Sequence, residues 1–98
     1  MEEHGKVIVV YPERTGVSQK TGENWKSVDF VIEVDGRYTR KVKFTLFGTK
    51  NVEMARLPVG EYISVRFEIE AHEWKGDYFN DLRAYDILKN GISCFAHS

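Results

Sequence analysis

The sequence predicts an all-β domain of five antiparallel strands, with one short helix between the third and the fourth strand. Apolar and polar residues alternate over long stretches of the chain, which is the pattern of strands with one buried face. Asp35-Gly36 and Lys75-Gly76-Asp77 interrupt this alternation as hairpin turns do. Only the stretch around 50–57 carries apolar residues at helical spacing.

Length and composition fit a single folded domain. The chain has 98 residues, of which 42% are hydrophobic and 30% charged, so wholesale disorder is not expected. A domain of this size can bury a core without disulfides or metal. We expect one domain over residues 1–98, with a barrel at about 5–88 and a C-terminal extension at 89–98. The net charge of −1 means that any attraction for nucleic acid must be local.

Cysteine content and the first residues predict the compartment. The single cysteine, Cys94, excludes an internal disulfide and fits a reducing environment. The acidic start, MEEHGKVIVVYP, contains an apolar run too short for a signal sequence or a membrane span. We therefore expect a protein that is cytoplasmic, or phage-encoded and acting inside a bacterial cell, and that has no membrane partner.

The first part of the chain predicts one strand and a long loop. We expect Met1 to His4 to be a loose lead-in. Lys6 to Tyr11 is rich in β-branched residues and ends at Pro12, which cannot donate to a strand ladder, so it predicts the first strand. Residues 12–24, PERTGVSQKTGEN, are polar and show no periodicity. They predict a loop, and long loops are often binding elements.

The second and third strands form the central hairpin around Asp35-Gly36, where glycine would allow the positive φ of a tight turn. Alternate residues of both strands form an apolar face, which we expect to line the core: Val28, Phe30, Ile32, Val34, Val42, Phe44 and Leu46. The opposite face carries an aromatic residue at each end and lysines between them: Trp25, Lys41, Lys43 and Phe47. Aromatic side chains interleaved with positive charge are typical of surfaces that bind single-stranded nucleic acid.

The second half of the chain completes the predicted barrel. Thr49 can cap a short helix over about Lys50 to Leu57. The fourth strand is predicted at Glu61 to Trp74 and the fifth at Tyr78 to Leu88. Alternation in the fourth strand predicts a second inward set: Ile63, Val65, Phe67, Ile69 and Ala71. The apolar residues of the tail are expected to pack on the barrel or on another subunit: Ile92, Cys94 and Phe95.

Five antiparallel strands with a helix after the third are the plan of the OB-fold, a small Greek-key barrel. This barrel commonly binds oligonucleotides through its second and third strands and the adjoining loops. The alternative five-stranded barrel, the SH3-like fold, does not require a helix at that place. The sequence therefore favours the OB-fold.

Three segments, FTLFGTK, LPVGEYISVRFEIEAHEW and KGDYFNDLRAYDI, resemble in this order those of bacterial single-stranded DNA-binding proteins. The chain resembles still more closely a group of uncharacterised small proteins of bacteria and their phages, over roughly Gly5 to Leu88. The resemblance implies that Phe47 and Trp74 stack on bases. Lys41 stands where the family usually has a stacking tryptophan, and a lysine there implies a phosphate contact instead.

The resemblance also implies assembly, because such DNA-binding proteins commonly form oligomers. We expect a homo-oligomer, either a dimer or a tetramer. The family recruits replication and repair partners through an acidic C-terminal tail, but this sequence ends FAHS. Recruitment of those partners by that route is therefore not expected.

The predicted function is binding of single-stranded nucleic acid, preferably DNA with RNA left open, with little sequence preference. Bases would stack on aromatic rings while lysines hold phosphates. The predicted nucleic-acid-binding residues are Trp25, Lys26, Lys41, Lys43, Phe47 and Trp74. The alternative is an OB-type assembly or interaction module, in which the same aromatic face meets a protein partner or a second copy.

The individual residues have alternative interpretations too. Trp25 could close one end of the barrel, Phe47 could be buried against another subunit, and Trp74 could pack on Tyr78 across the last hairpin. The lysines could be neutralised by acidic residues on the neighbouring strand, Asp29 and Glu33.

Catalytic and metal sites have little support in the sequence. His4, His72 and His97 are scattered, and Cys94 with His97 lacks a second pair at zinc-ligand spacing. The segment TGVSQKTG lacks the Gly-Lys-Ser/Thr ending of a phosphate-binding loop. We therefore expect a protein that is not an enzyme and needs neither a metal nor a cofactor.

Overall fold

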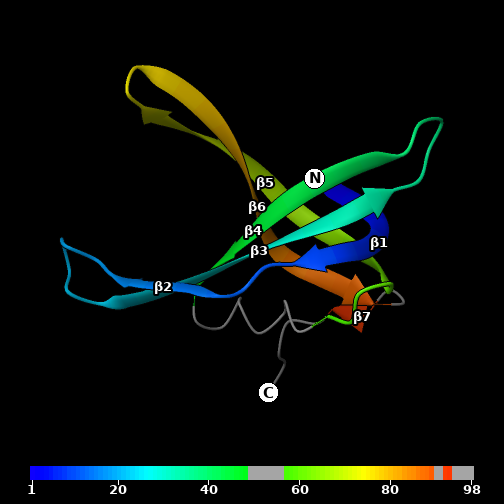
Figure 1. Ribbon diagram of the computed structural model, residues 1–98, viewed down its shortest axis with the longest axis horizontal. Coiled ribbons are helices and arrows are strands. Elements are labelled where there is room, and N and C mark those ends of the chain that lie inside the picture. Colours follow the sequence, from blue (N-terminus) through cyan, green and yellow to red (C-terminus); the bar gives the residue numbers. More distant parts are fainter. Residues whose placement is uncertain (49–56, 90–91, 94–98) are drawn as a thin grey trace.

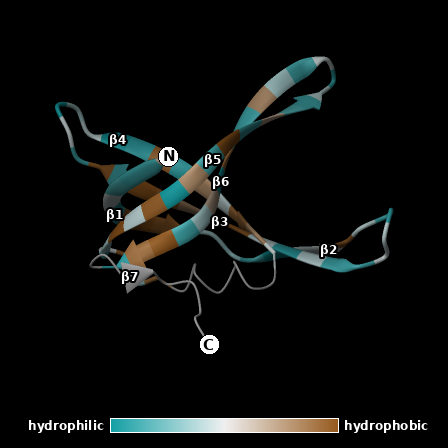
Figure 2. Cartoon of the chain, turned by 180° about the vertical axis from the view of Figure 1, so that it is seen from behind, coloured by the Kyte–Doolittle hydropathy of each residue, from teal (hydrophilic) through white to brown (hydrophobic). Residues whose placement is uncertain are grey.

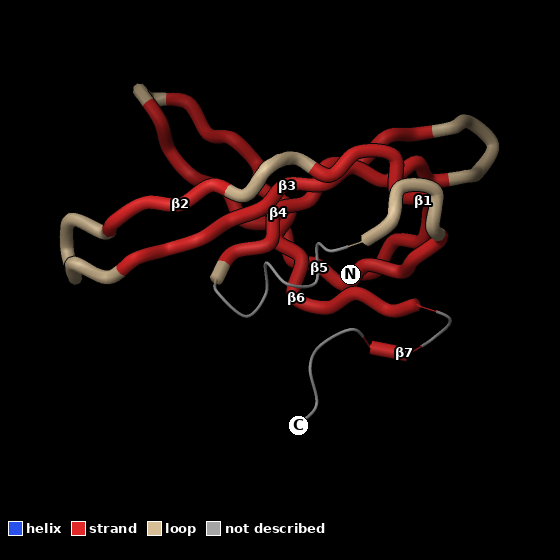
Figure 3. The backbone as a smooth tube through the Cα atoms, turned by 60° about the horizontal axis from the view of Figure 1, so that its bottom comes forward, coloured by secondary structure: helices blue, strands red, loops and turns tan. Residues whose placement is uncertain are grey.

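The computed structural model describes residues 1–48, 57–89 and 92–93, and all regular secondary structure in these residues is strand (Figures 1 and 3). The described residues form no helix able to cross a membrane. The strands are β1 (Glu2–Val10), β2 (Arg14–Val17), β3 (Asn24–Val34), β4 (Arg40–Phe47), β5 (Tyr62–Trp74), β6 (Asp77–Lys89) and β7 (Ile92–Ser93).

Five of these strands pair in a ring. β3 pairs with both β1 and β4, β1 pairs with β5, β5 with β6, and β6 returns to β4. The junction between β4 and β6 is parallel and consists of one bridge, from Thr45 to Arg83. β2 extends β3 outside the ring, and β7 pairs with the end of β6. The hairpins β2–β3, β3–β4 and β5–β6 extend away from this ring (Figure 1).

β1 contributes to both sides of the ring. Its first part, Glu2 to Lys6, pairs with β5, and the part from Lys6 to Val10 pairs with β3. Gly5 lies where β1 changes partner, and a Cβ atom there would overlap the backbone oxygen of Glu33. Glycine is therefore required at this position for the two strands to approach each other.

The inner face of the ring holds a packed apolar core, and Figure 2 shows brown, hydrophobic segments along the strands that form the ring. The phenyl group of Phe44 lies 5.6 Å from that of Phe30 and 4.9 Å from that of Phe67, measured between the centroids of these side chains. Of the residues predicted to face inward on β3, β4 and the first half of β5, Val42 is half-buried and packs against the core. The others are buried: Val28, Phe30, Ile32, Val34, Phe44, Leu46, Ile63, Val65 and Phe67. The predicted inner faces of β3, β4 and the first half of β5 are thus confirmed.

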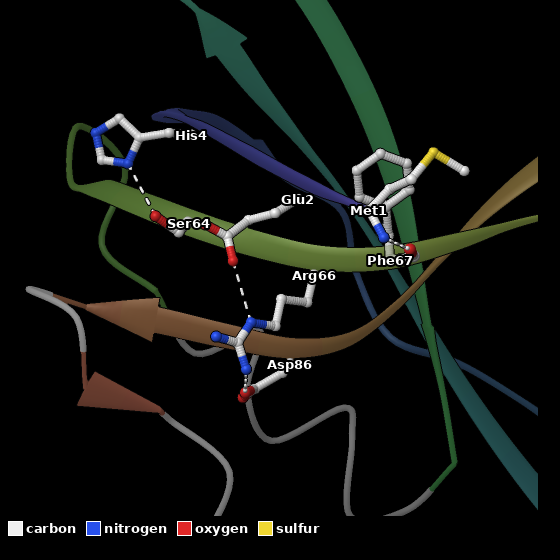
Figure 4. Close-up of polar contacts among 7 residues, drawn as sticks. All are labelled: Met1, Glu2, His4, Ser64, Arg66, Phe67 and Asp86. Carbon is white, nitrogen blue, oxygen red and sulfur yellow. Dashed lines mark hydrogen bonds and ion pairs between the residues drawn. The ribbon is translucent and has the colours of Figure 1, made fainter.

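The first residues are not a loose lead-in. Strand β1 begins at Glu2, and the amino group of Met1 donates to the carbonyl of Phe67 at 3.1 Å (Figure 4). Arg66 of β5 donates to Glu2 at 3.1 Å, and this hydrogen bond raises the pKa of Arg66. His4 lies 3.0 Å from the Ser64 hydroxyl. The prediction of a loose lead-in is wrong because the strand at MEEH is formed by main-chain pairing. Such pairing does not need apolar alternation, and this segment shows none.

The segment predicted as a loop, residues 12–24, contains a strand. β2 pairs with Asn24 to Ser27 of β3 and turns the region into a hairpin that projects from the ring. With β2 and β7, the described residues form seven strands rather than the five predicted.

The turn at Asp35-Gly36 is longer than predicted. Val34 pairs with Arg40, so five residues, 35–39, connect β3 and β4, and Gly36 does not have positive φ. A two-residue turn at Asp35-Gly36 would instead pair Phe30 with Lys41 and bring the lysine to the core face. The observed register pairs Phe30 with Phe44. Burial of the apolar face therefore decides the register against the local turn signal.

Strands β5 and β6 continue beyond the ring as a hairpin arm, defined as Glu68 to Arg83. Ile69 and Ala71 lie on this arm and are exposed, so their predicted inward position is wrong. No strand of the ring covers that face of the arm. The predicted helix at 50–57 falls outside the described residues except for Leu57, and Cys94 and Phe95 also fall outside them.

Candidate nucleic-acid interface

Two aromatic rings lie side by side on the outer face of the sheet. Trp25 of β3 and Phe47 of β4 are neighbours because Phe47 pairs with Ser27, two residues from Trp25 on the same face. Their centroids are 6.1 Å apart and their planes are inclined by 21°. Phe47 is 48% exposed and Trp25 is half-buried. Phe47 therefore points away from the core, as predicted.

Arg83 of β6 also lies over the ring of Phe47. Its guanidinium carbon lies 5.8 Å from the centre of the phenyl ring, within the range of a cation–π contact. The single bridge from Thr45 to Arg83 brings β6 to this position. Arg83 also forms an ion pair with Glu70 at 3.3 Å. A planar cation thus extends the aromatic surface across a third strand.

The aromatic pair separates two hollows of the surface. One measures about 330 Å³ and reaches from β2 to the hairpin arm; it is lined by Arg14, Trp25, Ser27, Thr45, Phe47, His72, Asp81 and Arg83. The other measures about 370 Å³, and its lining includes Ser18, Thr21, Asn24, Trp25 and Phe47. Both rings line both hollows, so flat groups can approach the pair from either side.

Hydrogen bonds organise the polar wall of the first hollow. Arg14 donates to the Ser27 hydroxyl at 2.9 Å and to the Asp29 carboxylate at 3.0 Å. Thr45 donates to the same oxygen of Asp29 at 2.8 Å. Across the hollow, His72 contacts Asp81 at 2.7 Å. The charge of Arg14 is therefore already compensated by Asp29.

Lys41 and Lys43 lie on the same outer face as the aromatic pair. Both side chains are exposed, and across the hairpin they face Glu33 and Val31. The ion pairs found among the described residues include neither lysine. Asp29, one of the acidic residues that could have neutralised them, is bonded to Arg14 and Thr45 instead.

Two of the predicted binding residues are not brought to this surface. Lys26 follows Trp25 directly and points to the opposite side of β3, where its ammonium lies 3.5 Å from Glu13. Trp74 is 62% exposed at the tip of the hairpin arm, with the Lys75 ammonium 5.7 Å from its ring centre. The register of the arm pairs Trp74 with Asp77, so it does not pack on Tyr78, which lies on the opposite face.

Metal ligands do not gather in the part of the chain that the structure describes. No group of three or more His, Cys, Asp or Glu side chains there could hold a metal ion. The pair of His72 and Asp81 is a contact of two residues and forms part of the hollow.

The family model described as "Domain of unknown function (DUF3127)" matches residues 2–88. The chain belongs to the DUF3127 family. No curated protein matches it. Its structure is similar to the crystal structure of Rim1, a mitochondrial single-stranded DNA-binding protein from S. cerevisiae, with a TM-score of 0.65. The similarity covers 91% of both chains at 15% sequence identity. At this identity the likeness shows the fold, and it supports the OB-type architecture predicted from the sequence.

The DUF3127 chain contains two contributors to the interface that sequence reasoning missed, Arg14 and Arg83. Arg14 was hidden in the segment predicted as a loop. Arg83 was detectable as an outward residue of the last strand, since it precedes the buried Ala84. Its contact with Phe47 on the adjoining strand β4 could not be inferred, because alternation gives a residue's face and not its partner on a strand distant in the sequence.

Proposed function

We propose that this DUF3127 protein binds single-stranded nucleic acid, in the first place DNA, across the outer face of β3 and β4 with little sequence preference. The observation that carries the proposal is the contact of the half-buried Trp25 with the exposed Phe47, on the same face as Lys41 and Lys43. The fold shared with a single-stranded DNA-binding protein adds support at the level of architecture.

The two kinds of residue have different roles in this proposal. Bases stack on Trp25 and Phe47 from the two hollows, and each stacked base contributes about 1–3 kcal/mol. Lys41 and Lys43 contact phosphates. Arg83 extends the stacking surface, because its guanidinium lies over Phe47 and is paired with Glu70. A duplex is disfavoured, because its bases are stacked on one another and cannot reach the rings.

The remaining predicted residues take secondary roles. Trp74 meets only a strand long enough to reach the tip of the hairpin arm. Lys26 makes no direct contact, because it lies on the other side of β3 and is paired with Glu13. The core of the proposed site is therefore Trp25, Phe47, Lys41 and Lys43.

The experiment that tests this function is titration of the protein with an unlabelled oligodeoxythymidylate at two salt concentrations, followed by tryptophan fluorescence. We expect quenching, because bases stack on Trp25, and weaker binding at higher salt, because phosphate contacts release counterions. A duplex of the same length serves as the control and should bind much more weakly. A folded protein that shows no quenching and no binding of any single strand at low salt would defeat the proposal.

One observation favours a second candidate function, protein–protein contact including self-association. The hairpin arm exposes apolar side chains that no other described strand covers: Ile69, Trp74, Tyr78 and Phe79. Exposed apolar surface of this kind marks interaction sites. Light scattering measures the oligomeric state and tests this function. Assembly through the arm is supported if the wild-type protein is a dimer or tetramer and becomes a monomer when Ile69 and Tyr78 are replaced by serine. A wild-type monomer contradicts it.

A further inference from the structure

The indole ring of Trp25 lies directly against a glycine of the neighbouring strand. β2 pairs with β3 so that Gly16 stands opposite Trp25. A Cβ atom at Gly16 would overlap Cζ2 of the indole and would lie 2.6 Å from Cε2 and 2.9 Å from Nε1. Real Cβ atoms do not approach other atoms this closely, so the ring occupies the space that any larger residue would fill.

Gly16 and Phe47 both limit where the ring of Trp25 can lie. The indole atoms Cζ2, Cε2 and Nε1 come close to Gly16 of β2, and the ring is inclined by 21° to that of Phe47, with centroids 6.1 Å apart. Trp25 thus contacts β2 and β4, which flank β3 at this position. A half-buried ring restricted in this way needs little reordering when a base stacks on its exposed part, and such preorganisation increases affinity.

The place of Gly16 within a strand also calls for a reason. Glycine in a strand interior weakens the strand, and it commonly marks a site of close approach. β2 has only four residues, Arg14 to Val17, and no buried apolar side chain. A residue with better strand propensity would stabilise β2 if the ring of Trp25 did not lie on it.

We infer that Gly16 is a positioning residue for nucleic-acid binding, which acts by letting the indole of Trp25 lie against β2 beside Phe47. The inference rests on the proposed function and adds to it the residue that orients the main stacking platform. The role of β2 is then to fix the position of the indole of Trp25.

The test is a double-mutant cycle between Gly16→Ala and Trp25→Ala, read by fluorescence anisotropy of a labelled oligodeoxythymidylate. In the wild-type background Gly16→Ala should weaken binding roughly tenfold, because a misplaced ring loses about the stacking of one base. In the Trp25→Ala background the same change should alter affinity by less than about twofold, because no ring remains to be displaced. The salt dependence should stay the same, since no phosphate contact is removed.

Two further variants separate positioning from a general effect on folding. Thr15→Ala changes the preceding residue of β2, which faces Lys26, and should leave affinity unchanged. In the background Trp25→Phe, the smaller ring lacks the indole atoms that face Gly16, so Gly16→Ala should cost no affinity there. This pair of variants is informative even if Gly16→Ala alone lowers the melting temperature.

The outcomes distinguish this inference from the proposed function. A wild-type protein that binds no strand at low salt overturns both. Binding that Gly16→Ala leaves unchanged, or weakens equally with and without Trp25, overturns the positioning role of Gly16 alone. Loss of binding that depends on the presence of Trp25 supports it.

Discussion

Replacing Phe47 by alanine separates the binding role of this side chain from its contribution to the fold. Phe47 is 48% exposed, whereas Phe44, three residues earlier on the same strand, is fully buried. Burying a phenylalanine completely stabilises a protein by about 1.5–3 kcal/mol, so the half-buried Phe47 contributes roughly 1 kcal/mol, and its contact with Trp25 adds about as much. We expect Phe47→Ala to lower the free energy of unfolding by about 1–2 kcal/mol. Phe44→Ala should lower it by about 3–5 kcal/mol, because it leaves a cavity.

The same change should also weaken binding. A stacked base contributes about 1–3 kcal/mol, which corresponds to a loss of affinity of roughly 5- to 150-fold for single-stranded DNA. Stacking releases no counterions, so the slope of log affinity against log salt should stay nearly constant. Affinity lost at a constant slope is the signature of a removed platform.

The assay combines anisotropy of a labelled oligodeoxythymidylate at several salt concentrations with thermal unfolding of each variant. Lys43→Ala is the matched comparison, since Lys43 lies on the same strand and the same face as Phe47. Unlike Phe47→Ala, it should change the slope of log affinity against log salt. Undiminished affinity of Phe47→Ala would refute the stacking role. Destabilisation equal to that of Phe44→Ala would refute the assignment of Phe47 to the outer face.

Two further predictions concern the other predicted binding residues. Lys41→Ala and Lys43→Ala should each make the slope of log affinity against log salt shallower by about 0.7. Lys26→Ala should leave this slope unchanged, because Lys26 faces the other side of β3 and is paired with Glu13. An effect of Lys26→Ala equal to that of the other two changes would contradict this geometry. Trp74→Ala should leave the affinity for a short oligonucleotide unchanged and weaken only longer strands, as measured by titration with a length series. Equal loss at every length would place Trp74 within the central site.

The faces of the central strands could be predicted because alternation and burial express the same physical requirement. Phe30, Ile32, Phe44 and Leu46 are apolar at every second position, and each is buried. β2 could not be predicted this way. Its sequence RTGV has no apolar alternation, and β2 is held by main-chain pairing and by the ring of Trp25 on Gly16. The hairpin arm was misjudged for the opposite reason, since Ile69 continues the alternation beyond the ring.

The candidate site could be predicted only in part. Alternation is sufficient to place Trp25, Lys41, Lys43 and Phe47 on one face, and the structure brings the two aromatic rings into contact there. It does not reveal which distant strand adjoins that face. Arg83 reaches Phe47 through the one parallel bridge of the ring, a contact between residues far apart in the sequence, which no local pattern encodes.

The distribution of charge around the site predicts how strongly salt should affect binding. The net charge is −1, and the arginines beside the aromatic pair are engaged by carboxylates, Arg14 by Asp29 and Arg83 by Glu70. These carboxylates reduce the attraction of the two arginines for phosphate, so Lys41 and Lys43 should make the main phosphate contacts. Two neutralised phosphates give a log–log slope of about −1.4 for a single strand. A measured slope steeper than about −3 would mean that further cations, such as Arg14 and Arg83, also contact phosphates, and that charge rather than stacking provides most of the affinity.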